Sequence, residues 1–150
     1  MVRTRYAATV IEIRTGSNRR VVLTARYALK FPRIRHPLCG LRSNRWEREM
    51  WQRWRPVFRW DQLCPVLFAD CLGIVLIMPR AAPADRDAVD AAIQRDGESY
   101  PQPTTEFLPD GYGLVNSHVM CFDYGVADGD MVREKRAHYA QFSNNHTDRP

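Results

Sequence analysis

Lys30 is the first residue whose type and surroundings suggest chemistry, because it interrupts the apolar, strand-like run RYALKFPR. It is one of only two lysines in a chain whose other positive charges are arginines. A lysine inside a buried strand is costly unless an anionic group meets its ammonium. The run therefore leaves two alternatives. Either Lys30 lies on an edge strand and reaches water along a packed stem, or it is buried and has an anionic partner.

Carboxylates elsewhere in the chain supply candidate partners. Glu47 follows Lys30 by 17 residues in the segment NRWERE, and Glu49 is a second candidate for the same role. Asp123 ends the apolar run VMCF and begins DYG, while Asp110 stands 13 residues earlier in LPDGYG. Carboxylate oxygens are suitable ligands for Mg²⁺. Both aspartates also belong to ordinary turn sequences, so a structural role without a metal stays open.

Hydrophobic periodicity and turn residues predict the elements that must position these side chains. In chain order they are strands within 6–14 and 19–31, a helix capped by Ser43 or Asn44 and ending near 54, strands within 65–78, a helix over 85–95, a hairpin over 112–125 and a helix over 130–142. We therefore predict the α+β class. An antiparallel N-terminal sheet with one packed helix is followed by an abbreviated rim made of helices and a hairpin.

This order of parts resembles the protein-kinase fold. YALKF is similar to the lysine strand of kinases, NRWERE supplies an acid on the next helix, and LIMPRAAP falls where the hinge between the lobes lies. CFDYG resembles the metal-binding Asp-Phe-Gly, with Tyr124 in place of phenylalanine. The resemblance covers roughly residues 6–125.

A kinase-like fold implies one domain over 1–150, in which 6–78 resembles the N-terminal lobe and 79–142 a truncated C-terminal lobe, with a frayed tail at 143–150. It also implies ATP and magnesium as cofactors. Lys30 would hold the α- and β-phosphates, and Glu47 would orient that lysine. Asp123 would bind magnesium, with Asp110 assisting from the position where kinases carry an asparagine.

Other positions depart from the kinase pattern. The catalytic aspartate of kinases would fall at Thr105, and the chain contains no HRD sequence. Glu106 is the neighbouring carboxylate and could serve as the base only if the loop were rearranged. The phosphate-covering loop has one glycine, Gly16, where the family has three. These departures predict a pseudokinase or a minimal phosphotransferase, and nucleotidyl transfer on a kinase-like scaffold is a further possibility.

A second functional class comes from the basic composition, which gives a net charge of +5. Arginines alternate with tryptophans over 42–60, a pattern suited to nucleic acid or an acidic protein partner. Trp46, Met50 and Trp54, however, recur at helical spacing, which favours a core stripe with the arginines on the solvated face.

Two further expectations concern metal and membrane. His36 and Cys39 could begin a zinc site, but no second close pair completes it. No run approaches the roughly 18 to 20 apolar residues of a membrane-spanning helix, and the N-terminus lacks the pattern of a signal peptide. We therefore expect no membrane partner and a cytoplasmic location.

Overall fold

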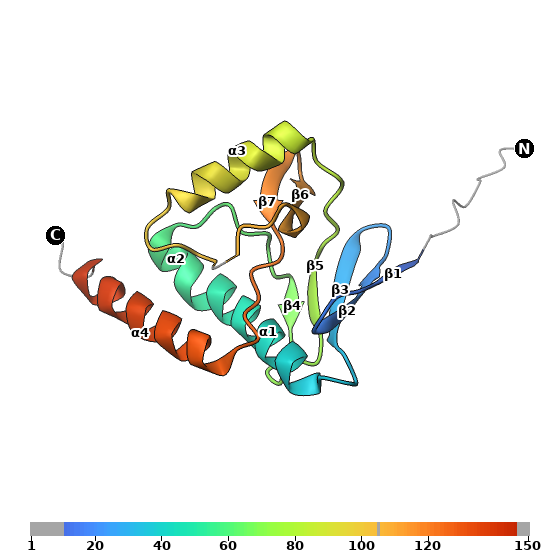
Figure 1. Cartoon of the computed structure of the whole chain (residues 1–150), viewed down its shortest axis with the longest axis horizontal. Coiled ribbons are helices and arrows are strands. Elements are labelled where there is room, and N and C mark those ends of the chain that lie inside the picture. Colours follow the sequence, from blue (N-terminus) through green and yellow to red (C-terminus); the bar gives the residue numbers. More distant parts are fainter. Residues whose placement is uncertain (1–10, 105, 147–150) are drawn as a thin grey trace, which may run out of the picture.

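The chain folds as an antiparallel sheet covered by helices, with a separate hairpin beside them (Figure 1). The computed structural model describes residues 11–104 and 106–146. The strands are β1 (Glu12–Thr15), β2 (Arg19–Leu23), β3 (Tyr27–Pro32), β4 (Phe68–Ala69), β5 (Leu76–Pro79), β6 (Tyr112–Val115) and β7 (His118–Cys121). The helices are α1 (Pro37–Glu49), α2 (Arg55–Phe58), α3 (Arg86–Gly97) and α4 (Gly129–His146), with a π-helical segment (Met50–Trp54) between α1 and α2. The predicted α+β class is confirmed. The part of the first predicted strand before residue 11 lies outside the described residues.

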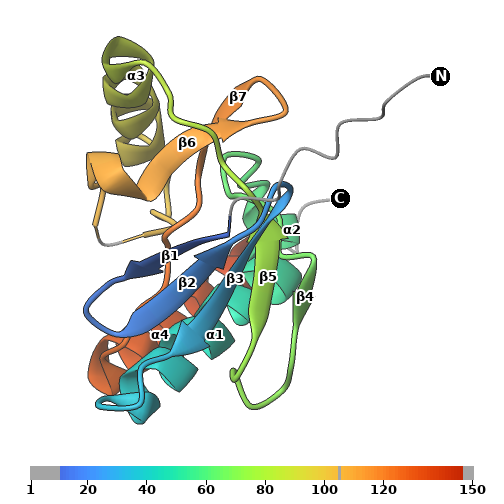
Figure 2. The same ribbon diagram turned by 90° about the vertical axis from the view of Figure 1, so that its right-hand side faces the viewer.

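Lys30 lies in the interior of the sheet. The order of the five strands is β1-β2-β3-β5-β4, so β3 has a hydrogen-bonded neighbour on both sides (Figure 2). Lys30 pairs with Val21 of β2 and with Leu76 of β5, and it is only 3% exposed. The edge-strand alternative is therefore wrong, and the ammonium group needs a partner inside the fold.

Helix α1 begins earlier than the sequence suggested. It starts at Pro37, where the missing backbone N–H of proline costs nothing because the first turn has no intrahelical acceptor for it. Ser43 and Asn44 are buried inside this helix, so the prediction that one of them caps it is wrong. The Asn44 amide instead donates to the carbonyl of Lys30 at 3.1 Å and to that of Gly73 at 2.9 Å. A residue type that favours caps serves here to join the helix to the sheet.

The core lies between α1, α4 and the sheet. Trp46, Met50 and Trp54 are each 2% exposed or less, so the predicted apolar stripe is confirmed. Figure 1 shows α4 running beside α1. From α4, the ring of Tyr139 lies 6.3 Å from that of Trp46 and 5.4 Å from that of Trp54. Such aromatic pairs add to the stabilisation that comes from burial alone.

Lys135 of α4 gives the stability of this core a measurable pH dependence. Burial lowers the pKa of Lys135 to about 8, below the value of about 10.4 in an unfolded chain. Between these values the unfolded state binds more protons, so the contribution of Lys135 to stability rises with pH. We expect Lys135→Met to be more stable than wild type near pH 7, by up to about 3 kcal/mol.

The measurement is urea unfolding of both proteins at neutral pH and near pH 10. The difference in unfolding free energy between wild type and Lys135→Met should shrink as the pH rises. A difference that stays constant across this range would contradict the lowered pKa.

The predicted hairpin forms from β6 and β7. Asn116 and Ser117 both have positive φ values, 51° and 66°, in its two-residue turn. Two successive positive φ values are typical of the tight turns whose twist matches that of paired strands. The hairpin is followed by the segment Phe122–Gly125. In the part of the chain that the structure describes, no helix has both the length and the apolar character to cross a membrane.

Candidate functional site

The ammonium of Lys30 meets the carboxylate of Glu47 between the sheet and α1. The Nζ atom lies 3.0 Å from Oε1 and 2.9 Å from Oε2 of Glu47, whose side chain is fully buried. It also donates to the carbonyl oxygen of Phe122 at 2.5 Å. Three acceptors match the three hydrogens of an ammonium group. Lys30 therefore has the anionic partner that its burial requires.

Glu49 does not share this role. Side chains two residues apart on a helix point in nearly opposite directions, because they are separated by a rotation of about 200° around the helix axis. Glu49 accordingly faces α4. There the Nε atom of Arg136 donates to both of its carboxylate oxygens at 2.9 Å. The sequence left both glutamates as candidates, and the orientation of α1 brings only Glu47 to Lys30.

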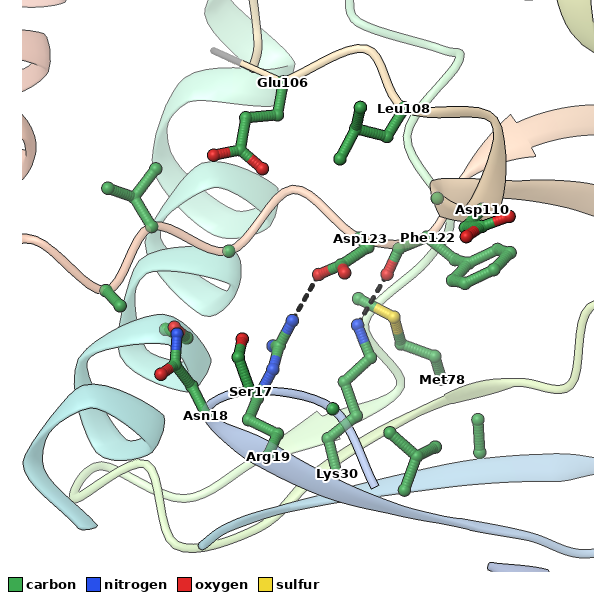
Figure 3. Close-up of a pocket in the computed structure, with 18 of the residues that line it drawn as sticks. Ser17, Asn18, Arg19, Lys30, Met78, Glu106, Leu108, Asp110, Phe122 and Asp123 are labelled. Carbon is green, nitrogen blue, oxygen red and sulfur yellow. Dashed lines mark hydrogen bonds and ion pairs between the residues drawn. The ribbon is translucent and has the colours of Figure 1, made fainter. Parts of the chain in front are cut away.

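Arg19 completes the charged cluster, although the sequence analysis did not single it out. Its NH1 atom lies 2.9 Å from Oε1 of Glu47, and its NH2 atom contacts Oδ1 of Asp123 (Figure 3). The signal was present in the two-residue period of β2, which places Arg19 on the same face as Val21 and Leu23. An arginine on an otherwise apolar strand face needs a buried partner, by the same physical argument as Lys30.

Asp123 and Tyr124 follow β7 and have different environments. The hydroxyl of Tyr124 is directed into the core and donates to the carbonyl of Cys64 at 2.9 Å, with the residue 1% exposed. The side chain of Asp123 is 55% exposed and lies on the wall of a cavity. The DYG segment therefore presents its carboxylate to the cavity while its aromatic ring anchors the backbone.

Gly125 allows this segment to lie close to the cluster. A β-carbon at this position would be 3.0 Å from Oε1 of Glu47 and 3.1 Å from each terminal nitrogen of Arg19. Contacts of this kind are tighter than real side chains normally make. A side chain at this position would force the ends of Glu47 and Arg19 to shift by a few tenths of an ångström, so packing favours the glycine of DYG whatever the site binds.

A cavity of about 480 Å³ opens beside the cluster, which is within the usual size range of small-molecule sites. Strands β2, β3 and β5 supply an apolar wall made of Val21, Leu23, Ala28 and Met78. Pro79 ends β5 and also lines the cavity. The turn between β1 and β2, the chain after β5 and the loop before β6 supply Gly16, Ser17, Asn18, Ala81, Glu106, Leu108 and Asp110. Arg19, Lys30 and Asp123 line the cavity at the charged cluster (Figure 3). The cavity thus combines an apolar wall with a small polar region.

The charges of the cluster compensate one another, with two cations facing two anions. Desolvation acts to raise the pKa of Asp123, but the positive charges of Arg19 and Lys30 outweigh it and hold this pKa below its usual range. Burial acts to lower the pKa of Arg19, and Glu47 and Asp123 together reverse that effect and raise it. Asp123 and Arg19 consequently stay ionised at neutral pH.

Of the other site residues that the sequence predicts, two lie at the cavity beside Lys30. Asp110 lies in a 3-10 turn (Pro109–Gly111) and is exposed, and it lines the same cavity as Asp123. Glu106 is also exposed and lines the cavity. Thr105, the position that corresponds to the catalytic base of kinases, lies outside the described residues. The cavity therefore collects Lys30, Asp110, Asp123 and Glu106, with Glu47 behind Lys30.

The carboxylates of this cavity are a poor fit for a resident magnesium ion. A cation at Asp123 has to compete with the guanidinium of Arg19, which already contacts Oδ1. Over residues 11–104 and 106–146, no group of three or more His, Cys, Asp or Glu side chains is placed to hold a metal ion. The pair His36 and Cys39 belongs to no such group either. Magnesium binding through Asp123 and Asp110 stays a prediction.

The tryptophans of the segment 42–60 mostly serve the core. Trp46, Trp54 and Trp60 are each 2% exposed or less, and the guanidinium of Arg55 covers the ring of Trp51 at 4.4 Å. Bases of a nucleic acid can stack only on exposed rings. Exposed arginines are thus the main feature of this segment that is open to an acidic partner.

Comparisons with protein-family models, with curated proteins and with solved structures found no match to this chain. The resemblance to protein kinases therefore stays a prediction from motifs and from the order of the elements. The geometry around Lys30 is the basis for any functional proposal.

Proposed function

We propose that this chain is a kinase-like nucleotide-binding protein that takes ATP into the cavity beside Lys30. The observation that carries the proposal is the buried ion pair of Lys30 and Glu47 on the wall of a cavity of about 480 Å³. A buried ion pair is weak evidence for stability, because desolvation offsets its Coulombic gain. A lysine held by a glutamate beside a cavity is, in contrast, the arrangement that kinases use to hold nucleotide phosphates.

The two ends of the cavity suit the two ends of a nucleotide. Val21, Ala28 and Met78 offer an apolar wall for a planar base. Lys30 and Arg19 lie at the charged end, where phosphates would be neutralised. The turn between β1 and β2 borders the same cavity through Gly16, Ser17 and Asn18.

Binding, rather than phosphoryl transfer, is the function that the residues support best. Glu106 is the carboxylate next to the expected base position, and its side chain extends toward the cavity (Figure 3). If the protein transfers a phosphoryl or nucleotidyl group, Glu106 is the candidate general base. A pseudokinase role needs no such base. Binding of an acidic protein or a nucleic acid by the segment 42–60 stays a separate prediction that rests mainly on its exposed arginines.

Thermal denaturation in the presence of ATP, ADP and adenosine tests the proposal. A ligand of the native state at 100 times its Kd stabilises that state by about 2.7 kcal/mol, which raises the Tm by several degrees in a chain of this size. Lys30→Met should abolish the shift caused by ATP. Lys135→Met, which changes the only other lysine, should keep it.

A second variant separates loss of binding from loss of folding. Ala28→Leu fills part of the apolar wall and leaves the charged cluster intact, so it should weaken the binding of all three ligands. The proposal fails if none of the ligands changes the Tm of the wild type, or if Ala28→Leu binds them as the wild type does.

A further inference from the structure

Arg19 already contacts the carboxylate at which a divalent cation is expected. Its NH2 atom contacts Oδ1 of Asp123, and its NH1 atom lies 2.9 Å from Oε1 of Glu47. The side chain of Arg19 is 10% exposed, whereas that of Asp123 is 55% exposed, so the arginine is the buried partner of this pair. Water therefore screens the guanidinium less than it screens a surface charge.

Arg19 disfavours a metal ion at Asp123. A divalent cation bound to Asp123 would be placed next to a guanidinium and repelled by it. Arginine loses its proton only above pH 12, and Glu47 and Asp123 raise the pKa of Arg19 further. The repulsion therefore persists at every physiological pH. Movement of Arg19 away from Asp123 would also leave Glu47 with one cationic partner instead of two.

Arg19 also has hydrogen-bond donors left for an anion. Arginine carries five N–H groups. Those of NH1 are directed to Glu47 and Asn44, and one of NH2 is directed to Asp123. Within the described residues, the Nε–H and the second N–H of NH2 have no acceptor. Lys30 adds its positive charge at the same end of the cavity, while its N–H groups are directed to Glu47 and Phe122.

We propose that Arg19 takes the place of a divalent cation at this site, so that the protein binds the phosphates of its nucleotide without magnesium. This inference rests on the proposed nucleotide binding. Arg19 neutralises Asp123, removing the repulsion that this carboxylate would exert on a phosphate, and it keeps two further N–H groups that are unpaired within the described residues. Its fixed positive charge and several donors suit it to phosphate recognition.

The other carboxylates of the cavity do not restore a metal site. Oδ1 of Asp128 accepts the N–H groups of Asp130 and Met131 at the start of α4. Asp110 and Glu106 are exposed, as Asp123 is, and no group of three or more metal-ligating side chains stands among the described residues. Asp123 is the carboxylate that lies beside Arg19, so the effect of magnesium is tested there.

Calorimetric titration of the whole chain with ATP, once in EDTA and once in magnesium chloride, tests the inference. The wild type should bind ATP with similar affinity in both buffers. Arg19→Ala should lose at least about tenfold in affinity in EDTA, since a hydrogen-bonded charge is removed from the phosphate. It should recover affinity when magnesium is added, because Asp123 is then free to bind the cation.

Two variants serve as controls for Arg19→Ala. Arg20→Ala removes the same charge from the next residue of β2, whose side chain is exposed on the opposite face, and it should bind ATP as the wild type does. Asp123→Asn keeps Arg19 and the shape of the site while removing the carboxylate charge. It should bind ATP in EDTA at least as tightly as the wild type, and this result decides the question if Arg19→Ala does not fold.

The possible failures are distinguishable. If ATP binds the wild type only when magnesium is present, the role of Arg19 is overturned and nucleotide binding stands. The role of Arg19 is also overturned if Asp123→Asn loses ATP binding, or if Arg19→Ala binds ATP in EDTA as tightly as the wild type does. If ATP binds in neither buffer, the proposed function fails and this inference fails with it.

Discussion

Glu47→Ala is expected to lower the free energy of unfolding by about 3–5 kcal/mol, because it leaves buried cations without their shared anion. Lys30 and Arg19 both lie within 3.0 Å of this carboxylate, and the Glu47 side chain is fully buried. Arg19 retains Asp123, but among the residues that the structure describes the only other acceptor of Lys30 is the carbonyl oxygen of Phe122. A domain is typically stable by only about 5–15 kcal/mol, so this variant should be close to the limit of folding.

Urea unfolding followed by circular dichroism measures the effect, and Glu49→Ala is the matched control. Glu49 lies on the same helix and is partly exposed, with a bidentate arginine partner and a hydrogen bond from Nε1 of Trp54, so its loss should cost about 1–2 kcal/mol. A double variant, Lys30→Met with Glu47→Leu, should be more stable than Glu47→Ala alone because no unpaired lysine remains. Equal losses for Glu47→Ala and Glu49→Ala would show that the cluster is not buried as described.

Trp54→Ala is expected to cost about 3–5 kcal/mol, the usual range when a large aromatic side chain is removed from a core. Trp54 is 2% exposed. Its ring lies 5.4 Å from that of Tyr139 on α4 and 6.2 Å from that of Phe58. Loss of the indole would therefore leave a cavity between the helices that the backbone cannot readily close.

Two measurements on Trp54→Ala separate a core role from a surface role. Its midpoint in urea should fall strongly, whereas Arg45→Ala, an exposed position of α1, should change the midpoint little. Binding to a single-stranded oligonucleotide at low salt should not depend on Trp54 while the protein is folded. An unchanged midpoint with lost oligonucleotide binding would assign Trp54 to an interaction surface instead.

Much of the fold could be predicted from local patterns. The apolar stripe Trp46, Met50 and Trp54 has the period of a helix, and the hairpin over 112–121 has alternating strands around a two-residue turn. These features depend on residues close together in the chain, which is why sequence alone reveals them. The start of α1 was mistaken because Ser43 and Asn44 are common cap residues. Asn44 is instead buried by contacts with β3 and with Gly73.

The site was predictable only in part, for a related reason. A lysine in an apolar strand needs an anionic partner, and this requirement follows from the cost of burying a charge. The choice of Glu47 over Glu49 depends on how α1 is rotated against the sheet, which its own sequence does not specify. Arg19 was overlooked because its partners stand 25, 28 and 104 residues further along the chain.

Local sequence patterns are enough to place Lys30 in a strand, acids on the next helix and after a later strand, and the first tryptophans on a helix face. The packing of distant segments makes β3 an interior strand and makes Glu47 the acid that Lys30 meets. The same packing brings Arg19 to Asp123. Burial and ion pairing are properties of groups that converge from distant segments, so they arise only when β2, β3, α1 and the chain after β7 have packed together.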